Sequence, residues 1–217
     1  MQRTLSVRDV AIDFVADGHV THAVKSISFD LQPGRTLAVV GESGSGKSVT
    51  AQAIMGLLPK SGRIAGGQIL YREPRTGKIT DIAALDRESE AFRALRGGRI
   101  AMIFQEPMTS LSPLHTIGDQ IGEALMLHTG ADRAAADERT TELLAKVGFR
   151  DPKGSLKTYP FELSGGMRQR AMIAMALVCN PAVLIADEPT TALDVTTQAH
   201  ILELMRELQR EYNMAIL

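Results

Sequence analysis

The first part of the chain combines extended apolar segments with a glycine-rich turn. Apolar and polar residues alternate from Leu5 to Val10, which predicts a short β-strand. Residues 36–40 are apolar and β-branched, as expected of a buried parallel strand. A glycine-rich turn follows, and residues 47–58 then have a helical pattern that ends at Pro59. The pattern therefore predicts a strand, a tight turn and a helix in direct succession.

The rest of the chain changes from hairpins to helices and then back to strands. Glycines and prolines over residues 61–80 indicate hairpins, and residues 99–104 are a second candidate for a buried strand. Apolar positions follow helical spacing between residues 107 and 163. A helix from about Gly166, a strand over residues 183–186, a further helix and the start of a strand at residues 214–217 complete the pattern. The positions expected on apolar helix faces are Ile117, Ile121, Ala124, Leu125, Leu143, Leu144, Val147, Ile201, Leu204, Met205 and Leu208.

This order of elements predicts one α/β domain over residues 1–217. We expect an α/β core with an N-terminal antiparallel β subdomain over about 1–106 and 164–217, and an inserted helical subdomain over about 107–163. Apolar residues make up 44% of the sequence and charged residues 23%, which suits a globular protein with an ample core.

Composition argues against several classes of function. The net charge is −1, so no basic field favours nucleic acid as a partner, and 4% aromatic residues without tryptophan disfavour a platform for stacking bases. The single cysteine, Cys179, excludes an internal disulfide and lies in an apolar run, so we expect a buried structural thiol. No apolar stretch approaches the ~20 residues of a membrane helix, so any membrane role is expected to come through a partner.

A phosphate-binding motif follows the strand predicted at residues 36–40. Residues 41–48 (GESGSGKS) match the P-loop pattern G-x-x-x-x-G-K-[ST], in which glycines let backbone N–H groups surround an anion at a helix N-terminus. Lys47 is expected to reach the β- and γ-phosphates of ATP, and the Ser48 hydroxyl to bind Mg²⁺. The alternative is a flexible surface turn. The candidate nucleotide-binding residues are Gly41, Glu42, Ser43, Gly44, Ser45, Gly46, Lys47, Ser48 and Val49.

A second motif places two carboxylates at the end of a buried strand. Residues 183–189 (VLIADEP) lead from an apolar strand into Asp187 and Glu188 at the sheet edge where open α/β sheets bind ligands. Asp187 is expected to hold Mg²⁺, and Glu188 to orient or deprotonate the attacking water. The alternative is a strand that ends in a solvated acidic turn. Together with the P-loop, this motif predicts a P-loop NTPase with a RecA-like core.

Residues 163–169 (LSGGMRQ) resemble the LSGGQ signature of the ABC ATPases, with Met167-Arg168-Gln169 as a longer variant in place of the last glutamine. Ser164 can cap a helix, and Gly165 and Gly166 let the backbone approach a phosphate. The P-loop already serves one nucleotide, so a second anion site of this kind suits a nucleotide held by another subunit. In the family this loop closes over the γ-phosphate of the opposite protomer, which implies a head-to-tail dimer of two ABC cassettes.

Other residues are similar to further motifs of the ABC family. Gln105 resembles the glutamine that binds Mg²⁺ and senses the membrane partner, and Asp194 resembles the aspartate of the loop that crosses the dimer interface. Phe14 stands where the family places an aromatic ring that stacks on adenine, although a core phenylalanine is the alternative. The resemblance implies ATP and Mg²⁺ as cofactors, catalytic roles for Glu188, Gln105 and Lys47, and metal ligation by Ser48, Gln105 and Asp187.

The P-loop, residues 102–111 and residues 163–194 resemble the ATPase subunits of oligopeptide, dipeptide, nickel and glutathione importers. Phe161 replaces a histidine usual in that group, and Ser112 replaces an asparagine. The resemblance implies ATP hydrolysis that energises import at the cytoplasmic face of the inner membrane. Its implied partners are transmembrane permease subunits and, indirectly, a periplasmic or extracellular solute-binding protein, and nucleic acid is not expected.

The family's switch histidine, which contacts the γ-phosphate, lies beyond the strand that starts near Met214. None of the five histidines follows that strand, so we expect the 217 residues to be part of a longer protein and to hydrolyse ATP weakly on their own. The histidines are His19, His22, His115, His128 and His200.

Two other functional classes stay open at the level of the sequence. A soluble ABC ATPase acting on DNA or ribosomes is disfavoured, because no heptad insertion separates the P-loop from the signature and one cassette is present. A nucleotide-gated interaction module without catalysis is the other alternative. Co-purification with a membrane subunit separates the importer from both.

Overall fold

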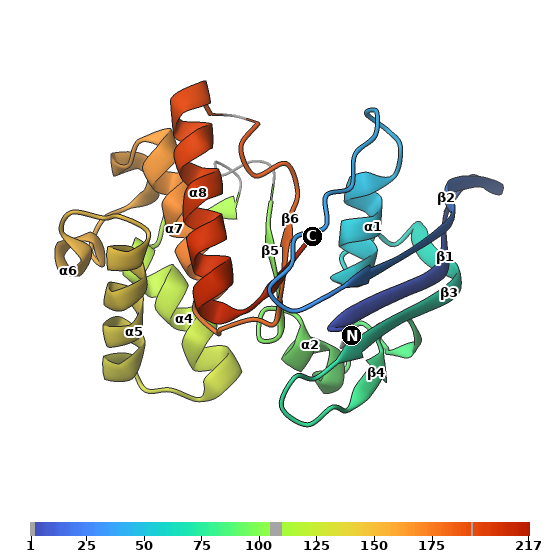
Figure 1. Ribbon diagram of the computed structural model, residues 1–217, viewed down its shortest axis with the longest axis horizontal. Helices are drawn as coiled ribbons and strands as arrows, with labels where there is room; N and C mark the ends of the chain where they lie inside the picture. Colours follow the sequence, from blue (N-terminus) through green and yellow to red (C-terminus); the bar gives the residue numbers. More distant parts are fainter. Residues whose placement is uncertain (1–2, 105–109, 192) are drawn as a thin grey trace.

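The computed structural model describes residues 3–104, 110–191 and 193–217. A parallel sheet runs through the middle of the molecule, between a group of helices and an antiparallel sheet packed with helix α1 (Figure 1). The mixture of sheets and helices is the predicted α/β class with an N-terminal antiparallel β region and a helical insertion. Within these described ranges, no helix is long and apolar enough to cross a bilayer.

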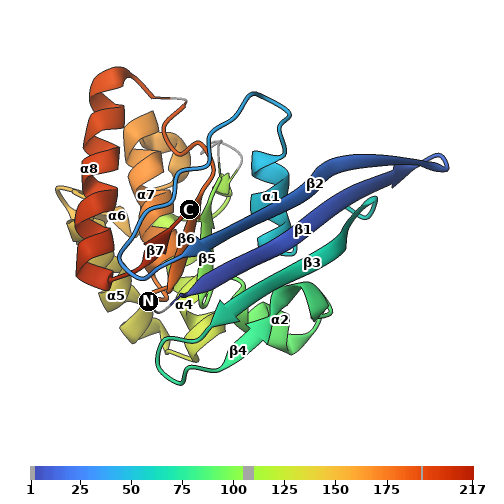
Figure 2. The ribbon, with the colours of Figure 1, turned by 45° about the vertical axis from the view of Figure 1, so that its right-hand side comes forward.

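The antiparallel sheet has the strand order β2-β1-β3-β4 and projects as a long twisted ribbon (Figure 2). The sequence predicts short strands here, and this prediction is wrong, since β1 and β2 have 12 and 13 residues. The register of β1 against β2 shifts between Val7 and Val10 and again before Ile12 and Asp13. Such bulges break the strict alternation that identifies a strand in a sequence. The strands are β1 (Leu5–Ala16), β2 (His19–Leu31), β3 (Gly62–Arg72) and β4 (Ile79–Asp81).

The parallel sheet has the order β5-β6-β7, with β5 at Ile100–Ile103, β6 at Val183–Ala186 and β7 at Ala215–Ile216. β5 and β6 confirm the strands expected from their apolar runs. The predicted strand over residues 36–40 is wrong beyond Thr36, which forms an isolated parallel bridge with Ile216. The Leu37 N–H donates to the Ile216 carbonyl at 2.8 Å, and residues 38–40 are exposed and have no strand assignment.

The helices begin where the sequence places good caps. Thr116, Asp132, Ser164 and Asp194 each accept a backbone N–H in the first turn of the helix that follows. The residues expected on the apolar faces of the long helices are buried, apart from the partly buried Ala124. Helix α1 ends earlier than predicted, before Gly56 turns the chain with a φ of 64°. The helices are α1 (Lys47–Ile54), α2 (Glu90–Leu95), α4 (Ile117–Thr129), α5 (Arg133–Lys146), α6 (Pro152–Ser155), α7 (Gly165–Leu177) and α8 (Val195–Tyr212).

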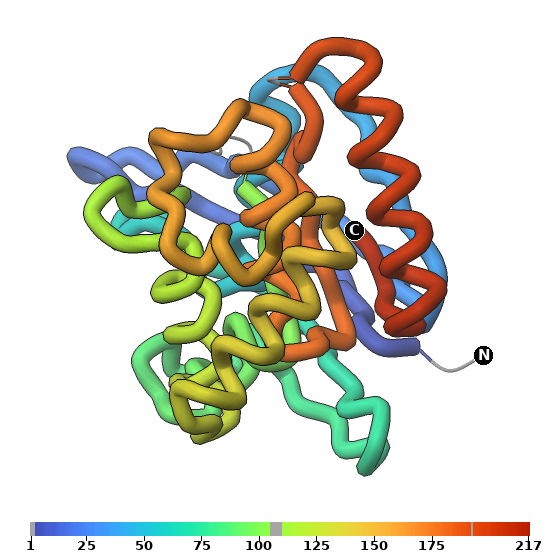
Figure 3. Tube along the Cα trace, turned by 90° about the vertical axis from the view of Figure 1, so that its left-hand side faces the viewer, coloured from blue at the N-terminus to red at the C-terminus, as the bar shows by residue number. Residues whose placement is uncertain are grey.

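Two hydrophobic cores lie on opposite sides of the parallel sheet. One core joins the sheet to α4, α5, α7 and α8, and the other joins it to α1 and the antiparallel sheet. The side chain of Leu184 belongs to the helical core, while Val183 and Ile185 belong to the core on the α1 side. Because alternate side chains of β6 are buried on both faces, the strand is held firmly where it delivers Asp187 to the sheet edge. The tube in Figure 3 shows α8 passing along the outer side of this arrangement.

Candidate nucleotide-binding site

The P-loop turn depends on two glycines in the left-handed conformation. Gly44 has a φ of 79° and Gly46 a φ of 92°. A Cβ added at Gly46 would lie 2.8 Å from Val24 Cγ2 and 3.1 Å from the Ala23 carbonyl, both on β2. Gly46 is also the N-cap of α1 and has no side chain that could cap the helix. The first N–H groups of α1 donate no hydrogen bond to a capping side chain and can bind an anion, as expected of a phosphate loop.

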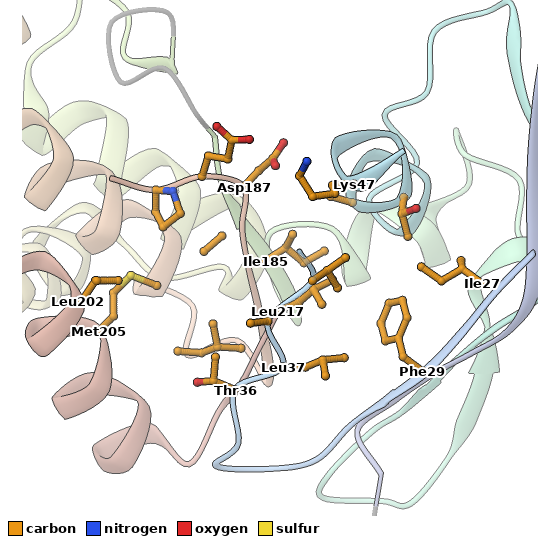
Figure 4. Close-up of a pocket in the computed structure, with 18 residues that line it drawn as sticks. Ile27, Phe29, Thr36, Leu37, Lys47, Ile185, Asp187, Leu202, Met205 and Leu217 are labelled. Carbon is orange, nitrogen blue, oxygen red and sulfur yellow. The ribbon is translucent and has the colours of Figure 1, made fainter. Parts of the chain in front are cut away.

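Lys47 lies at the start of α1 with its ammonium folded against the loop. Its Nζ donates to the carbonyl oxygens of Gly41 at 2.7 Å and Glu42 at 2.8 Å. Figure 4 shows the Lys47 side chain pointing toward Asp187 across the upper end of a cavity. The geometry thus places one cation beside the backbone of the loop that would surround a phosphate.

Ser48 and Asp187 meet at the same place from distant parts of the chain. The Ser48 hydroxyl donates to Asp187 Oδ1 at 3.1 Å. Asp187 is positioned by β6 and by its own N–H, which donates to the Ile103 carbonyl of β5 at 3.0 Å. A hydroxyl and a carboxylate that converge in this way are oxygen donors of the kind that Mg²⁺ prefers. Within the described ranges no cluster of three or more His, Cys, Asp or Glu forms a metal cage, which is compatible with Mg²⁺, since it is usually held by one or two carboxylates and phosphate oxygens.

Glu188 has an unusual backbone conformation directly after Asp187. Its φ is 48°, a region that residues with a Cβ rarely adopt. The Thr191 hydroxyl donates to Glu188 Oε2 at 3.1 Å, and the Thr191 N–H donates to the Glu188 carbonyl at 3.3 Å. The carboxylate is exposed at the rim of the site, where it can accept a proton from a water molecule.

A cavity of about 340 Å³ lies below these charged groups (Figure 4). Ile27, Phe29, Ile185, Leu202 and Met205 are among its apolar walls, and its charged lining residues are Lys47, Asp187 and Glu188. The charged groups therefore lie at one end of the cavity, beside the P-loop, and Thr36 lies at the other end.

The predicted signature residues begin helix α7. Ser164 accepts the Met167 N–H at 3.3 Å, and Gly165 and Gly166 form the first turn. A Cβ at Gly166 would lie 3.1 Å from Thr197 Cγ2 of α8, whereas one at Gly165 would meet no atom within 4 Å. Asp194 caps α8 by accepting from the Thr197 N–H at 3.0 Å and hydroxyl at 2.6 Å. The hydrogen bond from the Thr197 hydroxyl lowers the pKa of Asp194.

Comparison with known proteins identifies the family. The family model described as "ABC transporter" matches residues 24–191. The chain belongs to the ABC transporter family. The resemblance expected from its P-loop and signature is thereby confirmed.

Two curated relatives of this ABC protein are named as dipeptide and peptidoglycan transport ATP-binding proteins. The dipeptide transport ATP-binding protein DppD of Bacillus subtilis is 49% identical over 218 residues, covering 100% of this chain and 63% of the relative. The peptidoglycan transport ATP-binding protein YejF of Agrobacterium fabrum is 55% identical over 217 residues, covering 100% of this chain and 38% of the relative. The chain thus spans less than two thirds of the length of either relative.

A solved structure shares the fold of this ABC protein. The dimeric ATP-binding cassette MJ0796, in a post-hydrolysis state bound to ADP and Pi, superposes with a TM-score of 0.77 at 25% identity. The superposition covers 98% of this chain and 85% of that chain. The predicted P-loop NTPase fold is confirmed by this likeness.

Some predicted site residues lie apart from the P-loop or outside the described part of the ABC protein. Gln105 falls within residues 105–109, which lie outside the described residues. Phe14 pairs with Thr21 and Gly62 in the antiparallel sheet and packs against its core. It is not among the residues that line the cavity beside Lys47, so its contacts fit the core alternative and its contact with adenine stays a prediction.

Two contacts at the site of this ABC protein could not be identified from its sequence. One is the hydrogen bond from Thr191 to Glu188. The other joins the buried Gln169 of α7 to the Pro189 carbonyl at 2.6 Å. Nothing in the residue pattern marks either pair, because each depends on how the turn after β6 packs against the start of α7 and α8.

Proposed function

We propose that this ABC protein binds Mg-ATP and hydrolyses it to energise the import of peptides or related small solutes through a membrane ABC transporter. The observation that carries the proposal is the convergence of Lys47, Ser48 and Asp187 at the N-terminus of α1. A cation, a hydroxyl and a carboxylate at a glycine-rich helix start match the needs of a nucleoside triphosphate and its metal. The peptide transport relative DppD supports the choice of solute class.

Each polar group has a definite role in this proposal. Lys47 can turn from the carbonyls of Gly41 and Glu42 to the β- and γ-phosphate oxygens, while the N–H groups of residues 41–49 surround the phosphates. Ser48, Asp187 and Gln105 would hold Mg²⁺, which neutralises phosphate charge when bound. Glu188 orients the attacking water and accepts its proton. Phe14 is the proposed contact for adenine.

We propose that two cassettes work head to tail. Ser164, Gly165 and Gly166 present a helix N-terminus whose first N–H groups suit a phosphate, and the P-loop of the same chain already provides one such site. The second phosphate would therefore belong to a partner cassette, with Asp194 at the interface. The dimeric state of MJ0796 supports this arrangement.

An apolar groove suits a permease subunit at the cytoplasmic face of the inner membrane. The groove has a volume of about 290 Å³ and is lined by residues that follow α1 and α2 and by residues of β5, α4 and α7. Leu57 and Phe104 line it with 37% and 42% of their surfaces exposed. It lies where the proposed α/β core (about 1–106 and 164–217) meets the proposed helical subdomain (about 107–163). A solute-binding protein would act indirectly, through the permease.

Two experiments test the proposal on the protein as its gene encodes it. Binding of a fluorescent ATP analogue and steady-state phosphate release are measured for the wild type and for Glu188→Gln. We expect the variant to keep ATP affinity, to lose turnover and to form a dimer in ATP on size-exclusion chromatography. Turnover at the wild-type rate would remove Glu188 from its role.

Co-purification with the permease tests the transport part of the proposal. Leu57→Glu places a charge in the apolar groove on an exposed position, so we expect it to reduce co-purification and to leave ATP binding unchanged. A protein that hydrolyses ATP but never associates with a membrane subunit would contradict the transport assignment.

A further inference from the structure

Helix α7 is tied to the turn that carries Glu188 by one buried side chain. Gln169 is 1% exposed, and its Nε2 donates to the Pro189 carbonyl at 2.6 Å. The two residues are 20 positions apart and belong to different elements. A buried amide that loses its partner costs free energy, so this hydrogen bond ties the turn to the helix.

The turn needs such a tie because its backbone is strained. Glu188 has a φ of 48° and is followed by Pro189, whose ring restricts the conformation of the residue before it. Backbone conformations of this kind persist where the surroundings hold them in place. Side-chain contacts act on this turn: the amide of Gln169 donates to the Pro189 carbonyl, and the hydroxyl of Thr191 contacts the Glu188 carbonyl at 3.3 Å and donates to Glu188 Oε2 at 3.1 Å.

We propose that Gln169 and Thr191 are positioning residues of the ATPase site, which set the place of the Glu188 carboxylate. This inference rests on the proposed function. Gln169 holds the backbone directly after Glu188, and Thr191 holds the Glu188 carboxylate. Both the main chain and the side chain of the proposed catalytic residue are therefore held in place.

The same link joins Glu188 to the signature. Gln169 lies five residues after Ser164 on one helix, and a helix of 13 residues moves as a rigid rod. Gly166 fits closely against Thr197 of α8, so the start of α7 is also packed against the segment that follows the turn. A shift of α7 when a phosphate binds at Ser164 would therefore move the Pro189 carbonyl and with it Glu188.

The test compares Gln169→Leu with Gln209→Leu. Gln209 is also buried and donates its amide to Thr36 Oγ1 at 2.9 Å, so it loses an equivalent hydrogen bond away from the turn. We expect Gln169→Leu to lower kcat by on the order of 10²-fold, the effect of an ångström-scale misplacement. KM for ATP and the affinity for a fluorescent ATP analogue stay within about 3-fold of the wild type, since the P-loop is unchanged. Gln209→Leu lowers the melting temperature and keeps kcat.

Thr191 provides a second variant that does not depend on a buried substitution. Thr191 is exposed, so we expect Thr191→Val to fold normally and to lower kcat. We expect Thr191→Ser, which keeps the hydroxyl, to have the kcat of the wild type. In a Glu188→Gln background, single-turnover rates with and without Gln169→Leu should be equal, because a residue that acts through Glu188 has nothing further to position.

The outcomes separate this inference from the function on which it rests. Loss of kcat that disappears in the Glu188→Gln background supports it. An unchanged kcat in both Gln169→Leu and Thr191→Val, or a loss that persists in that background, overturns it while the ATPase assignment stands. A wild-type protein that binds no ATP would overturn the proposed function and this inference together.

Discussion

The hydroxyl of Ser48 lies 3.1 Å from the carboxylate of Asp187, although 139 positions separate the two residues. Ser48 is fixed by the first turn of α1, and Asp187 by the end of β6. α1 packs into the same core as Val183 and Ile185 of β6, so the two oxygens are brought together by the fold and not by local sequence.

Replacing Lys47 with alanine should weaken ATP binding about 10- to 100-fold. A charge-assisted hydrogen bond contributes about 1.5–3 kcal/mol, and Lys47 is the ammonium that lies at the P-loop carbonyls. Titration with a fluorescent ATP analogue measures the change. Lys60→Ala, which removes an exposed lysine beyond α1, is the matched control and should bind like the wild type. Equal affinities in the two variants would contradict the P-loop assignment.

Replacing Ser48 with alanine should remove the gain in ATP affinity that Mg²⁺ provides. The variant loses the Ser48 hydroxyl, one of the two oxygen donors that converge at this site, and keeps the other, the Asp187 carboxylate. The backbone of the loop expected to surround the phosphates is unchanged. Titrations in Mg²⁺ and in EDTA distinguish the two contributions. We expect the EDTA affinities of the wild type and the variant to agree. A variant that still responds to Mg²⁺ like the wild type would show that Ser48 is not a ligand.

Replacing Gly46 with alanine should destabilise the protein and abolish nucleotide binding. Residue 46 has a φ of 92°, and a Cβ added there would lie 2.8 Å from Val24 Cγ2 and 3.1 Å from the Ala23 carbonyl oxygen. Backbone strain alone costs about 1–3 kcal/mol, which lowers the melting temperature by roughly 2–4 °C per kcal/mol in a protein of this size. Gly18→Ala is the matched control, since Gly18 has a φ of 77° but nothing within 4 Å. The difference between the two melting temperatures isolates the steric part, and a Gly46 variant no less stable than the control would contradict it.

Cys179 should react slowly with thiol reagents in the folded protein. Burial raises the pKa of its thiol to about 11 from the ordinary 9.0, and its Sγ lies 3.6 Å from the Ala124 carbonyl. At pH 8 this higher pKa lowers the thiolate fraction roughly 10²-fold, and the thiolate is the reactive form. Alkylation rates in buffer and in denaturant measure this protection. Equal rates would show that the thiol is accessible in the native state.

The parts of the fold that the sequence predicts well are those with local causes. The strand at Val183–Ala186 and the cap at Ser164 follow from an apolar run and from a side chain that bonds its own helix. Of the strand expected at residues 36–40, Thr36 and Leu37 contact Ile216 of β7, and an apolar run does not by itself show which of its positions pair. The lengths of β1 and β2 were missed because bulges interrupt their alternation.

The candidate site also has parts that the sequence predicts and parts that depend on contacts between distant residues. The P-loop and the Asp187-Glu188 pair are compact motifs, so their chemistry can be proposed from residue types and spacing alone. The contact of Gln169 with Pro189 joins a helix to a turn across the fold, and a glutamine within an apolar helix gives no sign of its partner. Whether Phe14 meets adenine or the core is likewise a question of packing, and a single aromatic residue in a strand cannot answer it.

The two faces of β6 have a consequence for how this protein can change over generations. Leu184 and Ile185 are neighbours in the chain but belong to different cores, and the strand continues directly into the two carboxylates. A volume change in either core would tilt the strand and displace Asp187 relative to Ser48. Substitutions in the core around the helices and in the core around the antiparallel sheet must therefore compensate one another. The reason is that the four-residue strand β6 contacts both cores and positions Asp187.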